Sequence, residues 1–353
     1  MTVNDNKPYE PACPLPISAK KTVQLAHGGG GRLMQELIQD VFVRAFHNPM
    51  LAPLHDGATW PVEQGTLAFT TDSYVVRPLF FPGGDIGSLA VNGTINDLAM
   101  CGAKPLYLSA GFILEEGLSM EVLQRVVHSM AETTRAAGVP IVAGDTKVVH
   151  RGKGDGIFIN TSGVGLVPDG VRVLPTLIQP SDAILVSGDL GCHGVAVLSV
   201  REGLTFDSPI ESDSAPLHHV VADLIDNGIE IHCLRDLTRG GLASVLNELA
   251  TAAKVGVTVD EAAIPVSEPV RGACELLGLD PLYVANEGRF VAMVPAPQAE
   301  AALTVMRRHG VASHAAQIGA VTERHTLPVV LRTVLGTQRI LDLLSGEQLP
   351  RIC

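Results

Sequence analysis

The sequence predicts a two-domain protein of the α/β or α+β class, in which helices and strands alternate. A chain of 353 residues is too long for one ordinary hydrophobic core, so two domains are expected. Hydrophobic residues make up 46% of the chain and aromatic residues only 4%, which suits an enzyme packed with Ala, Val, Leu and Ile. Prolines and a glycine cluster at 168–180, and we place the domain boundary there.

The chain therefore divides into four expected parts. Residues 1–20 contain four prolines and little periodicity, which indicates a disordered or loosely attached lead-in. The N-terminal domain is expected at 21–170 and the C-terminal domain at 180–340. The last part, 341–353, is a short tail, and its terminal cysteine is expected to be accessible and able to swing.

Charge and cysteine content exclude several classes of protein. The net charge of −12 argues against a nucleic-acid or membrane partner, although divalent metal ions could bridge a nucleotide to carboxylates. The six cysteines include no CxxC pair, which disfavours zinc sites and disulfides. We find no signal peptide, and no apolar run reaches the roughly 20 residues of a membrane helix. A reduced cytoplasmic protein is expected.

A run of glycines precedes the first expected helix, at 33–46. Gly28, Gly29, Gly30 and Gly31 leave backbone N–H groups free to face an anion, and the helix N-terminus that follows favours negative charge. No Gly-Lys-Ser/Thr sequence follows, so this is not a Walker A loop. A flexible hinge is the alternative interpretation.

Periodicity predicts most of the remaining elements. In the N-terminal domain we expect strands at 66–76, 106–114, 139–149 and 157–167, with a helix at 119–137. In the C-terminal domain we expect strands at 183–187 and 290–294 and further strands to about 331, with helices at 192–202, 215–226, 242–250 and 297–309.

The stretch 82–105 has the most unusual pattern. Its apolar stripe has helical spacing and consists of Val91, Ile95, Leu98 and Ala99. Asp85 is the expected N-cap. Asn92 and Asn96 share one side of this helix, and Gly93 and Asp97 share another. Asparagine and glycine disfavour a helix interior, so their presence indicates a functional site. A surface helix with polar decoration is the alternative.

Other polar residues interrupt strands or precede glycine turns. Asp72 lies inside a β-branched run, and Asp56 precedes a glycine that predicts a turn. The segment 144–147, Gly-Asp-Thr-Lys, is expected to break a buried strand and suits metal and phosphate contacts, with a plain hairpin turn as the alternative. Asp236 and Thr238 precede a glycine pair that opens a helix.

Several motifs together resemble a known family. They are HGGGG, TTDS, GDIGSLAVNGTINDLAMCGAKP, AGDTKVV, RDLTRGGLA, ANEGR and the ending PRIC. From residue 20 onwards the chain resembles the HypE family of hydrogenase maturation proteins, within the aminoimidazole ribonucleotide synthetase-like superfamily. The long GDIG block is specific for the superfamily, and the PRIC ending is specific for HypE.

The resemblance implies a fold and an activity. The fold has two α/β domains, with an N-terminal mixed sheet that packs against its copy in a homodimer. ATP would bind in a cleft. The C-terminal thiol would receive a carbamoyl group from the carbamoyltransferase HypF and dehydrate it to a thiocyanate with ATP. The cyano group would pass to the iron site of the HypC–HypD complex, for the nickel–iron cofactor.

The resemblance also assigns acidic residues to a metal site. Asp72, Asp97, Asp145 and Asp236 match acidic positions of the superfamily, and Asp56 is a fifth candidate. They would hold Mg²⁺ against the triphosphate, as hard oxygen ligands should. Such ions would also reconcile an acidic protein with an anionic substrate.

Further residues are assigned to ATP and to catalysis. The expected ATP contacts are Gly28, Gly29, Gly30, Asp85, Asn92, Asn96, Thr146 and Thr238. Cys353 would be the covalent carrier, acting as a thiolate nucleophile toward the carbamoyl group. Glu287, otherwise a turn carboxylate, would be the general base, and Lys147 its electrostatic partner or that of the transferring phosphate.

Two alternatives remain open. One is a small-molecule kinase or synthetase of the same superfamily, of the selenophosphate or thiamine-phosphate type. It does not need a terminal cysteine, and Cys13 is a poor candidate for the N-terminal nucleophile of a selenophosphate enzyme. The other is a scaffold without turnover, which has no need of four costly carboxylates.

Overall fold

The fold was obtained as a computed structural model and is described for residues 31–37, 39, 55–56, 58–62, 65–206, 209–324, 328–343 and 352–353. The expected lead-in, the glycines at 28–30 and most of the tail lie outside these residues. Of the helix expected at 33–46, the described part is α1 (Arg32–Leu37).

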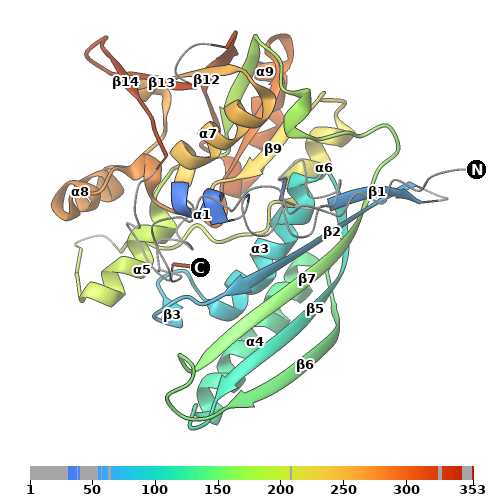
Figure 1. The fold of residues 1–353 in the computed structure, drawn as a ribbon, viewed down its shortest axis with the longest axis vertical. Helices are drawn as coiled ribbons and strands as arrows, with labels where there is room; N and C mark the ends of the chain where they lie inside the picture. The colour runs from blue at the N-terminus through green and yellow to red at the C-terminus, as the bar shows by residue number, and fades with distance from the viewer. Residues whose placement is uncertain are drawn as a thin grey trace, which may run out of the picture.

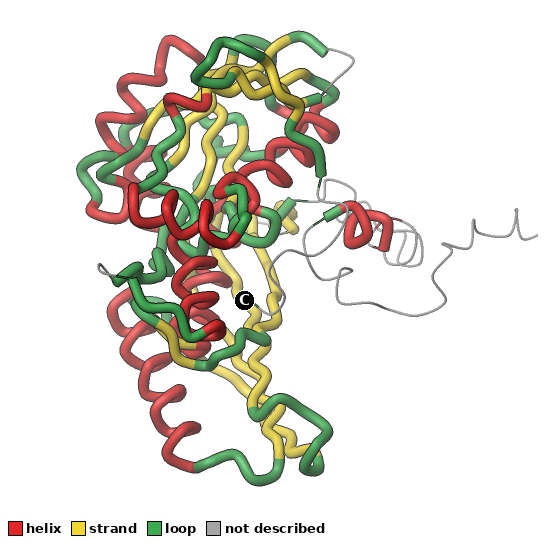
Figure 2. The backbone as a smooth tube through the Cα atoms, turned by 90° about the vertical axis from the view of Figure 1, so that its left-hand side faces the viewer, coloured by secondary structure: helices red, strands yellow, loops and turns green. Residues whose placement is uncertain are grey.

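The N-terminal domain is built on a five-stranded mixed sheet (Figure 1). Its strands, in spatial order, are β1 (Ala58–Val62), β2 (Gly65–Tyr74), β7 (Ile157–Val167), β5 (Lys104–Glu115) and β6 (Ile141–Val149). Only β5 and β6 run parallel. Helices α3 (Ile86–Met100) and α4 (Met120–Ala137) cover one face of this sheet (Figure 2). A two-stranded ribbon, β3 (Phe80–Phe81) with β4 (Gly84–Asp85), precedes α3.

The other face of this sheet is open in the single chain and carries large apolar side chains. Phe69, Tyr107, Ile113 and Leu166 are all exposed there, on three adjacent strands. Antiparallel sheets that face water usually alternate apolar-in with polar-out. An apolar outer face therefore departs from the usual pattern.

The C-terminal domain is a seven-stranded sheet between two layers of helices. Its strands, in spatial order, are β14 (Gln338–Ile340), β13 (Val329–Arg332), β10 (Gly256–Asp260), β12 (Ala316–Thr322), β8 (Asp182–Val186), β11 (Phe290–Pro295) and β9 (Cys233–Asp236). One face packs against α7 (Gly241–Ala253), the other against α6 (His218–Asp226) and α9 (Ala299–Met306). Helices α5 (Cys192–Glu202) and α8 (Glu268–Leu277) lie beside them. The two-domain α/β prediction is confirmed.

Among the residues that the structure describes, no helix has both the length and the apolarity that crossing a membrane requires.

Helix α3 is buried nearly all round, so the alternative of a decorated surface helix is wrong. Val91 and Ile95 of its apolar stripe pack in the N-terminal core, and its last residues, Ala99 and Met100, reach the C-terminal core. Asp85 caps it as predicted, because the carboxylate accepts hydrogen bonds from the N–H groups of Gly87 and Ser88. The helix therefore belongs to both domains.

The expected break at residues 144–147 is wrong, and so is the hairpin alternative. Strand β6 runs through this segment without interruption. Gly144 is needed for a different reason, since a Cβ there would lie 2.6 Å from the carbonyl oxygen of Ala110 on β5. The glycine permits close approach of two strands rather than a turn.

A pair of helical glycines gives a stability test of this packing. A Cβ at Gly93 would lie 2.2 Å from the hydroxyl of Tyr74, which is itself only 1% exposed and has little room to move. We expect Gly93→Ala to lower the free energy of unfolding by about 1–3 kcal/mol, as overpacked cores do. The control is Gly272→Ala in α8, where a Cβ meets nothing within 4 Å. That change should stabilise by up to about 1 kcal/mol. Equal effects in urea denaturation would contradict the packing described.

Candidate active site

A cavity of about 760 Å³ lies between the two domains. Both domains and the end of the chain contribute side chains to it, among them those of Asp56, Asp72, Asp97, Arg235, Asp236, Thr238, Arg239, Glu287 and Cys353. The C-terminus lies in the middle of the molecule in both views (Figures 1 and 2). The cavity is therefore formed by segments that are far apart in the sequence.

Three carboxylates meet in this cavity. Asp56 precedes β1, Asp97 lies on α3 and Asp236 ends β9, and each offers an oxygen atom within 4.8 Å of the others. The Thr70 hydroxyl donates to Asp97 Oδ2 at 2.8 Å, and Arg235 Nε lies 2.7 Å from Asp56 Oδ1. Asp56 Oδ2 is buried and has no hydrogen-bond partner among the described residues. Clustered, incompletely paired carboxylate oxygens fit a hard divalent cation.

The electrostatics of the cluster support the same conclusion. Burial, together with repulsion from neighbouring carboxylates, raises the pKa of Asp97 well above its usual range. Burial likewise raises the pKa of Asp56 despite the Arg235 guanidinium, and raises that of Asp236 to about 6. Keeping all three ionised near neutral pH therefore requires added positive charge.

Glu287 lies at the cavity wall and is almost fully buried. Its Oε1 atom has no hydrogen-bond partner among the described residues. Burial, and then repulsion from Asp236 and Asp72, raise the pKa of Glu287 well above its usual range. A carboxylate with a raised pKa is a better proton acceptor than an ordinary one, which is the property that a general base needs.

The last residue of the chain reaches into the same cavity. Ile352 is 3% exposed and packs in the N-terminal core, and the N–H of Val75 donates to the Cys353 carbonyl at 3.2 Å. Burial raises the pKa of the Cys353 thiol, and the nearby Arg239 guanidinium opposes that rise. Cys353 itself is partly exposed in this arrangement, in which the buried Ile352 anchors the end of the tail. A tail that can also swing out stays a prediction.

The structure brings most of the predicted residues together and leaves some apart. Of the candidates, Asp56, Asp72, Asp97, Asp236, Thr238, Glu287 and Cys353 line the cavity. Asp145, Thr146 and Lys147 do not line it, and lie exposed on β6, where Lys147 Nζ is 2.7 Å from Asp145 Oδ2. The contacts predicted for Gly28, Gly29 and Gly30 fall outside the described residues.

Three predicted ATP contacts have other partners in the structure. The Asp85 carboxylate caps α3. Asn92 Nδ2 donates to the Ser214 hydroxyl at 3.2 Å, and Asn96 Nδ2 donates to the carbonyls of Ala215 and Glu287 at 3.0 and 3.2 Å. These amides hold the loop beside the cavity.

Arg239 and His55 are two of the lining residues that sequence reasoning missed. Arg239 is half-buried and interacts electrostatically with Cys353 and Glu287, and the signal was a basic residue within the glycine-rich motif DLTRGG. His55 also lines the cavity, and its Nε2 lies 3.1 Å from the carbonyl oxygen of Met100. Burial lowers its pKa to about 4, so it is neutral at pH 7. Nothing in its sequence context distinguished it from an ordinary histidine.

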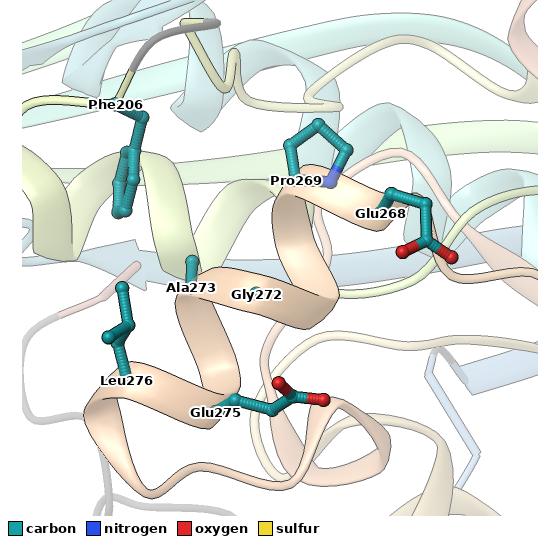
Figure 3. Close-up of a pocket in the computed structure, with 7 residues that line it drawn as sticks. All are labelled: Phe206, Glu268, Pro269, Gly272, Ala273, Glu275 and Leu276. Atoms are coloured by element: carbon teal, nitrogen blue, oxygen red, sulfur yellow. The ribbon is translucent and has the colours of Figure 1, made fainter.

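A second hollow, of about 580 Å³, lies on the outside of the C-terminal domain (Figure 3). It is lined by Phe206 and by residues of α8, including the exposed Leu276. Its charged residues are two glutamates, Glu268 and Glu275, and no predicted site residue lies in it. It is therefore not the candidate site.

Comparison with known proteins decides the family. Models of AIR synthase related proteins match both halves, the N-terminal domain at 54–167 and the C-terminal domain at 179–332. Carbamoyl dehydratase HypE of Azotobacter vinelandii is 55% identical over 332 residues, 94% of this chain and 97% of that protein. The chain belongs to the HypE family. The resemblance found in the sequence is thereby confirmed.

Solved structures of HypE proteins agree with the fold. A HypE in complex with ATP has 51% identity, a TM-score of 0.79 and coverage of 94% of this chain and 100% of its own. A HypE–HypF complex contains a chain with 49% identity, a TM-score of 0.83 and coverage of 87% and 99%. A thiamine monophosphate kinase from Aquifex aeolicus, at 17% identity and a TM-score of 0.64, covers 87% of this chain and 99% of its own, and shows the fold alone.

Removing a carboxylate from the cluster is predicted to stabilise the metal-free protein and to weaken metal binding. Without divalent ions, Asp97→Asn should raise the free energy of unfolding at pH 7 by about 1 kcal/mol or more, because it removes a carboxyl group that the folded state must either protonate or hold charged beside like charges. The folded state holds protons more tightly, so wild-type stability should fall as pH rises from about 4 to 6, the window set by Asp236. That fall should be shallower in the variant.

Denaturation with EDTA or with added Mg²⁺ tests both statements. Mg²⁺ should stabilise the wild type and have little effect on Asp97→Asn. The control is Asp226→Asn, at the exposed end of α6 and not among the residues that line the cavity, which should respond to Mg²⁺ as the wild type does. A destabilised, Mg²⁺-responsive Asp97→Asn protein would contradict the role of this cluster.

Proposed function

We propose that this protein is an ATP-dependent carbamoyl dehydratase that converts a carbamoyl group on Cys353 into a thiocyanate. The observation that carries the proposal is the position of the Cys353 thiol, which shares one cavity with clustered carboxylates and with Glu287. A kinase for a small free substrate would have no use for its own chain end in that place.

The chemistry requires that the carbamoyl oxygen become a leaving group. ATP would transfer its γ-phosphoryl group to that oxygen, and the C–O bond would then break to release inorganic phosphate. The nitrogen would lose two protons, one of them to Glu287, as the carbon–nitrogen triple bond forms. Removal of one water from the thiocarbamate balances the reaction, with ADP and phosphate as products.

Charge neutralisation is the other requirement of phosphoryl transfer. Asp56, Asp97 and Asp236, with Asp72 beside them, would hold Mg²⁺. When bound, that ion would neutralise charge on the triphosphate. Arg239, half-buried in the same cavity as Cys353, would orient the group on the thiol. Thr238 and the N–H groups that follow it would face the phosphates at the start of α7.

The place of Cys353 at the chain end suits a carrier that meets several partners. We propose that it receives the carbamoyl group from HypF and, after dehydration, delivers the cyano group to the HypC–HypD iron site, in the cytoplasm. The docked tail described above would be the state in which dehydration occurs. A cysteine fixed in a core could not visit a donor and an acceptor.

Mass spectrometry tests this function. We expect Cys353 to gain a carbamoyl group when the chain is incubated with HypF, its carbamoyl-donor substrate and ATP. The carbamoylated chain, once isolated, should lose the mass of one water only when Mg-ATP is added. Cys353→Ala should show neither change. The proposal would be overturned if the wild-type chain never lost water. It would also be overturned if the Cys353→Ala chain gained the carbamoyl group and lost water as the wild type is expected to do.

We further propose a homodimer formed through the open face of the N-terminal sheet. Its four exposed apolar residues give that face the character of an interface. Asp145 and Lys147 share the face, because they pair in register with Gly111 and with the exposed Ile113. In a dimer, Lys147 would therefore serve the cavity of the partner chain rather than its own.

Mixed dimers test the role of Lys147. Lys147→Ala should bind ATP normally but dehydrate at less than about a hundredth of the wild-type rate, the size of effect that acid–base groups have. When it is co-expressed with Cys353→Ala, the dimer that contains one chain of each should regain turnover at the intact Cys353. Sedimentation of the wild type checks the dimer first. Undiminished turnover in Lys147→Ala would remove this residue from the mechanism, and an inactive mixed dimer would place it in its own chain.

A further inference from the structure

A buried histidine outside the cavity binds the backbone of the tail. His193, on α5, is 0% exposed, and its Nε2 lies 2.8 Å from the carbonyl oxygen of Ile352. A carbonyl can only accept, so Nε2 must carry the proton and donate it. This contact is one residue from the carrier Cys353.

A serine on the loop at 211–215 fixes the ring of this histidine. Ser212 Oγ lies 2.8 Å from His193 Nδ1 and accepts a hydrogen bond from the N–H of Ser214 at 3.1 Å. The Ser212 hydroxyl can then donate its proton to Nδ1 of His193. The single N–H of the neutral ring is therefore at Nε2. The N–H of Ser212 donates to the carbonyl of Pro82 at 2.8 Å, which anchors the serine.

Packing holds the ring in the same orientation. Phe81 meets the His193 ring edge-on, with ring centroids 5.3 Å apart. Burial lowers the pKa of His193, so the neutral form that donates from Nε2 alone is favoured. Phe81 and the buried side chain of Ile352 both belong to the N-terminal hydrophobic core. Apolar contact and a directed hydrogen bond therefore act on a single residue of the tail.

We propose that His193, oriented by Ser212, is a positioning residue that holds the tail in register and so places the Cys353 thiol in the cavity. The inference rests on the proposed function for its catalytic consequence but not for the docking itself. Packing of Ile352 alone would allow the tail to slide or rotate. A donor aimed at its carbonyl fixes one register, and the N–H of Val75 on the next carbonyl completes it.

This role predicts different effects on dehydration and on carbamoylation, the two reactions in which the tail takes part. Dehydration needs a docked tail and should slow when His193 is changed, whereas carbamoylation needs an undocked tail and should not slow. A residue that merely stabilises the fold would not separate the two steps. Cys353 should also become more reactive toward iodoacetamide, because the thiol is only partly exposed when the tail is docked and fully accessible when it is not.

The test uses three variants of the full-length protein. His193→Phe keeps a ring against Phe81 but loses the donor, and His193→Gln retains a donor near the Nε2 position. The matched control is His218→Phe, since His218 is also buried and its Nε2 lies 3.1 Å from a backbone carbonyl oxygen, that of Ala137, away from the tail. Peptide mapping separates alkylation of Cys353 from that of the other five of the six cysteines.

We expect His193→Phe to shift the docking equilibrium about tenfold toward the undocked tail, as loss of one buried hydrogen bond would. Alkylation of Cys353 should become faster and dehydration at saturating ATP slower, by factors that multiply to about ten, with the Kd for ATP unchanged. His193→Gln should restore part of both effects, and His218→Phe should show neither. If His193→Phe does not fold, Ser212→Ala replaces it, with effects of the same sign and smaller size.

Alkylation that is the same in His193→Phe and wild type would overturn the inference. Equal changes in His193→Phe and His218→Phe would do so too, because they would indicate general loosening. Faster alkylation in His193→Phe together with a wild type that never loses water would keep the positioning role and reject the dehydratase function. The two failures are therefore distinguishable.

Discussion

The carboxamide of Asn96 connects the two domains beside the active cavity. It is 1% exposed, donates to the carbonyls of Ala215 and Glu287, and accepts a hydrogen bond from the N–H of Leu217 at 2.8 Å. Leaving any of these groups unpaired would be costly in a buried site, so the helix and the loops have one preferred arrangement. Asp97 is the next residue along the helix. The amide that fixes the backbone of Glu287 therefore also fixes this proposed base relative to the carboxylate cluster that is proposed to bind the metal.

Repulsion within the carboxylate cluster is the second constraint. Asp56, Asp97 and Asp236 are held together by strands and a helix whose apolar faces pack in different cores. The folded protein accepts this cost because the same charges would attract a divalent ion and, through it, a triphosphate. An acidic protein can thus bind an anionic substrate. The general pattern is that functional sites depart from the rules that the rest of the chain obeys.

Most elements were predictable from the sequence because their periodicity is set by one buried face, as in β7 and α4. The buried position of α3 was not predictable. Its asparagines form hydrogen bonds with a loop of the other domain, and no local sequence pattern reveals such contacts. Convergence of three carboxylates depends on sheet order, so spacing alone could not predict it. For the same reason the sequence could not show that Asp145 lies outside the cluster, because the register of β6 is what places it on the open face. Arg239 was missed because its role depends on a chain end that lies 114 residues away.

The central claim is that ATP phosphorylates the carbamoyl oxygen on Cys353 within this cavity. Oxygen-isotope tracing tests it most directly. The chain would be carbamoylated with ¹⁸O in the carbonyl, then given unlabelled Mg-ATP, and the released phosphate would be analysed by mass spectrometry. The account predicts one ¹⁸O atom in the inorganic phosphate for each thiocyanate formed. Label that appears in water while the phosphate stays unlabelled would contradict it, because the oxygen would then have left without ever being bonded to phosphorus.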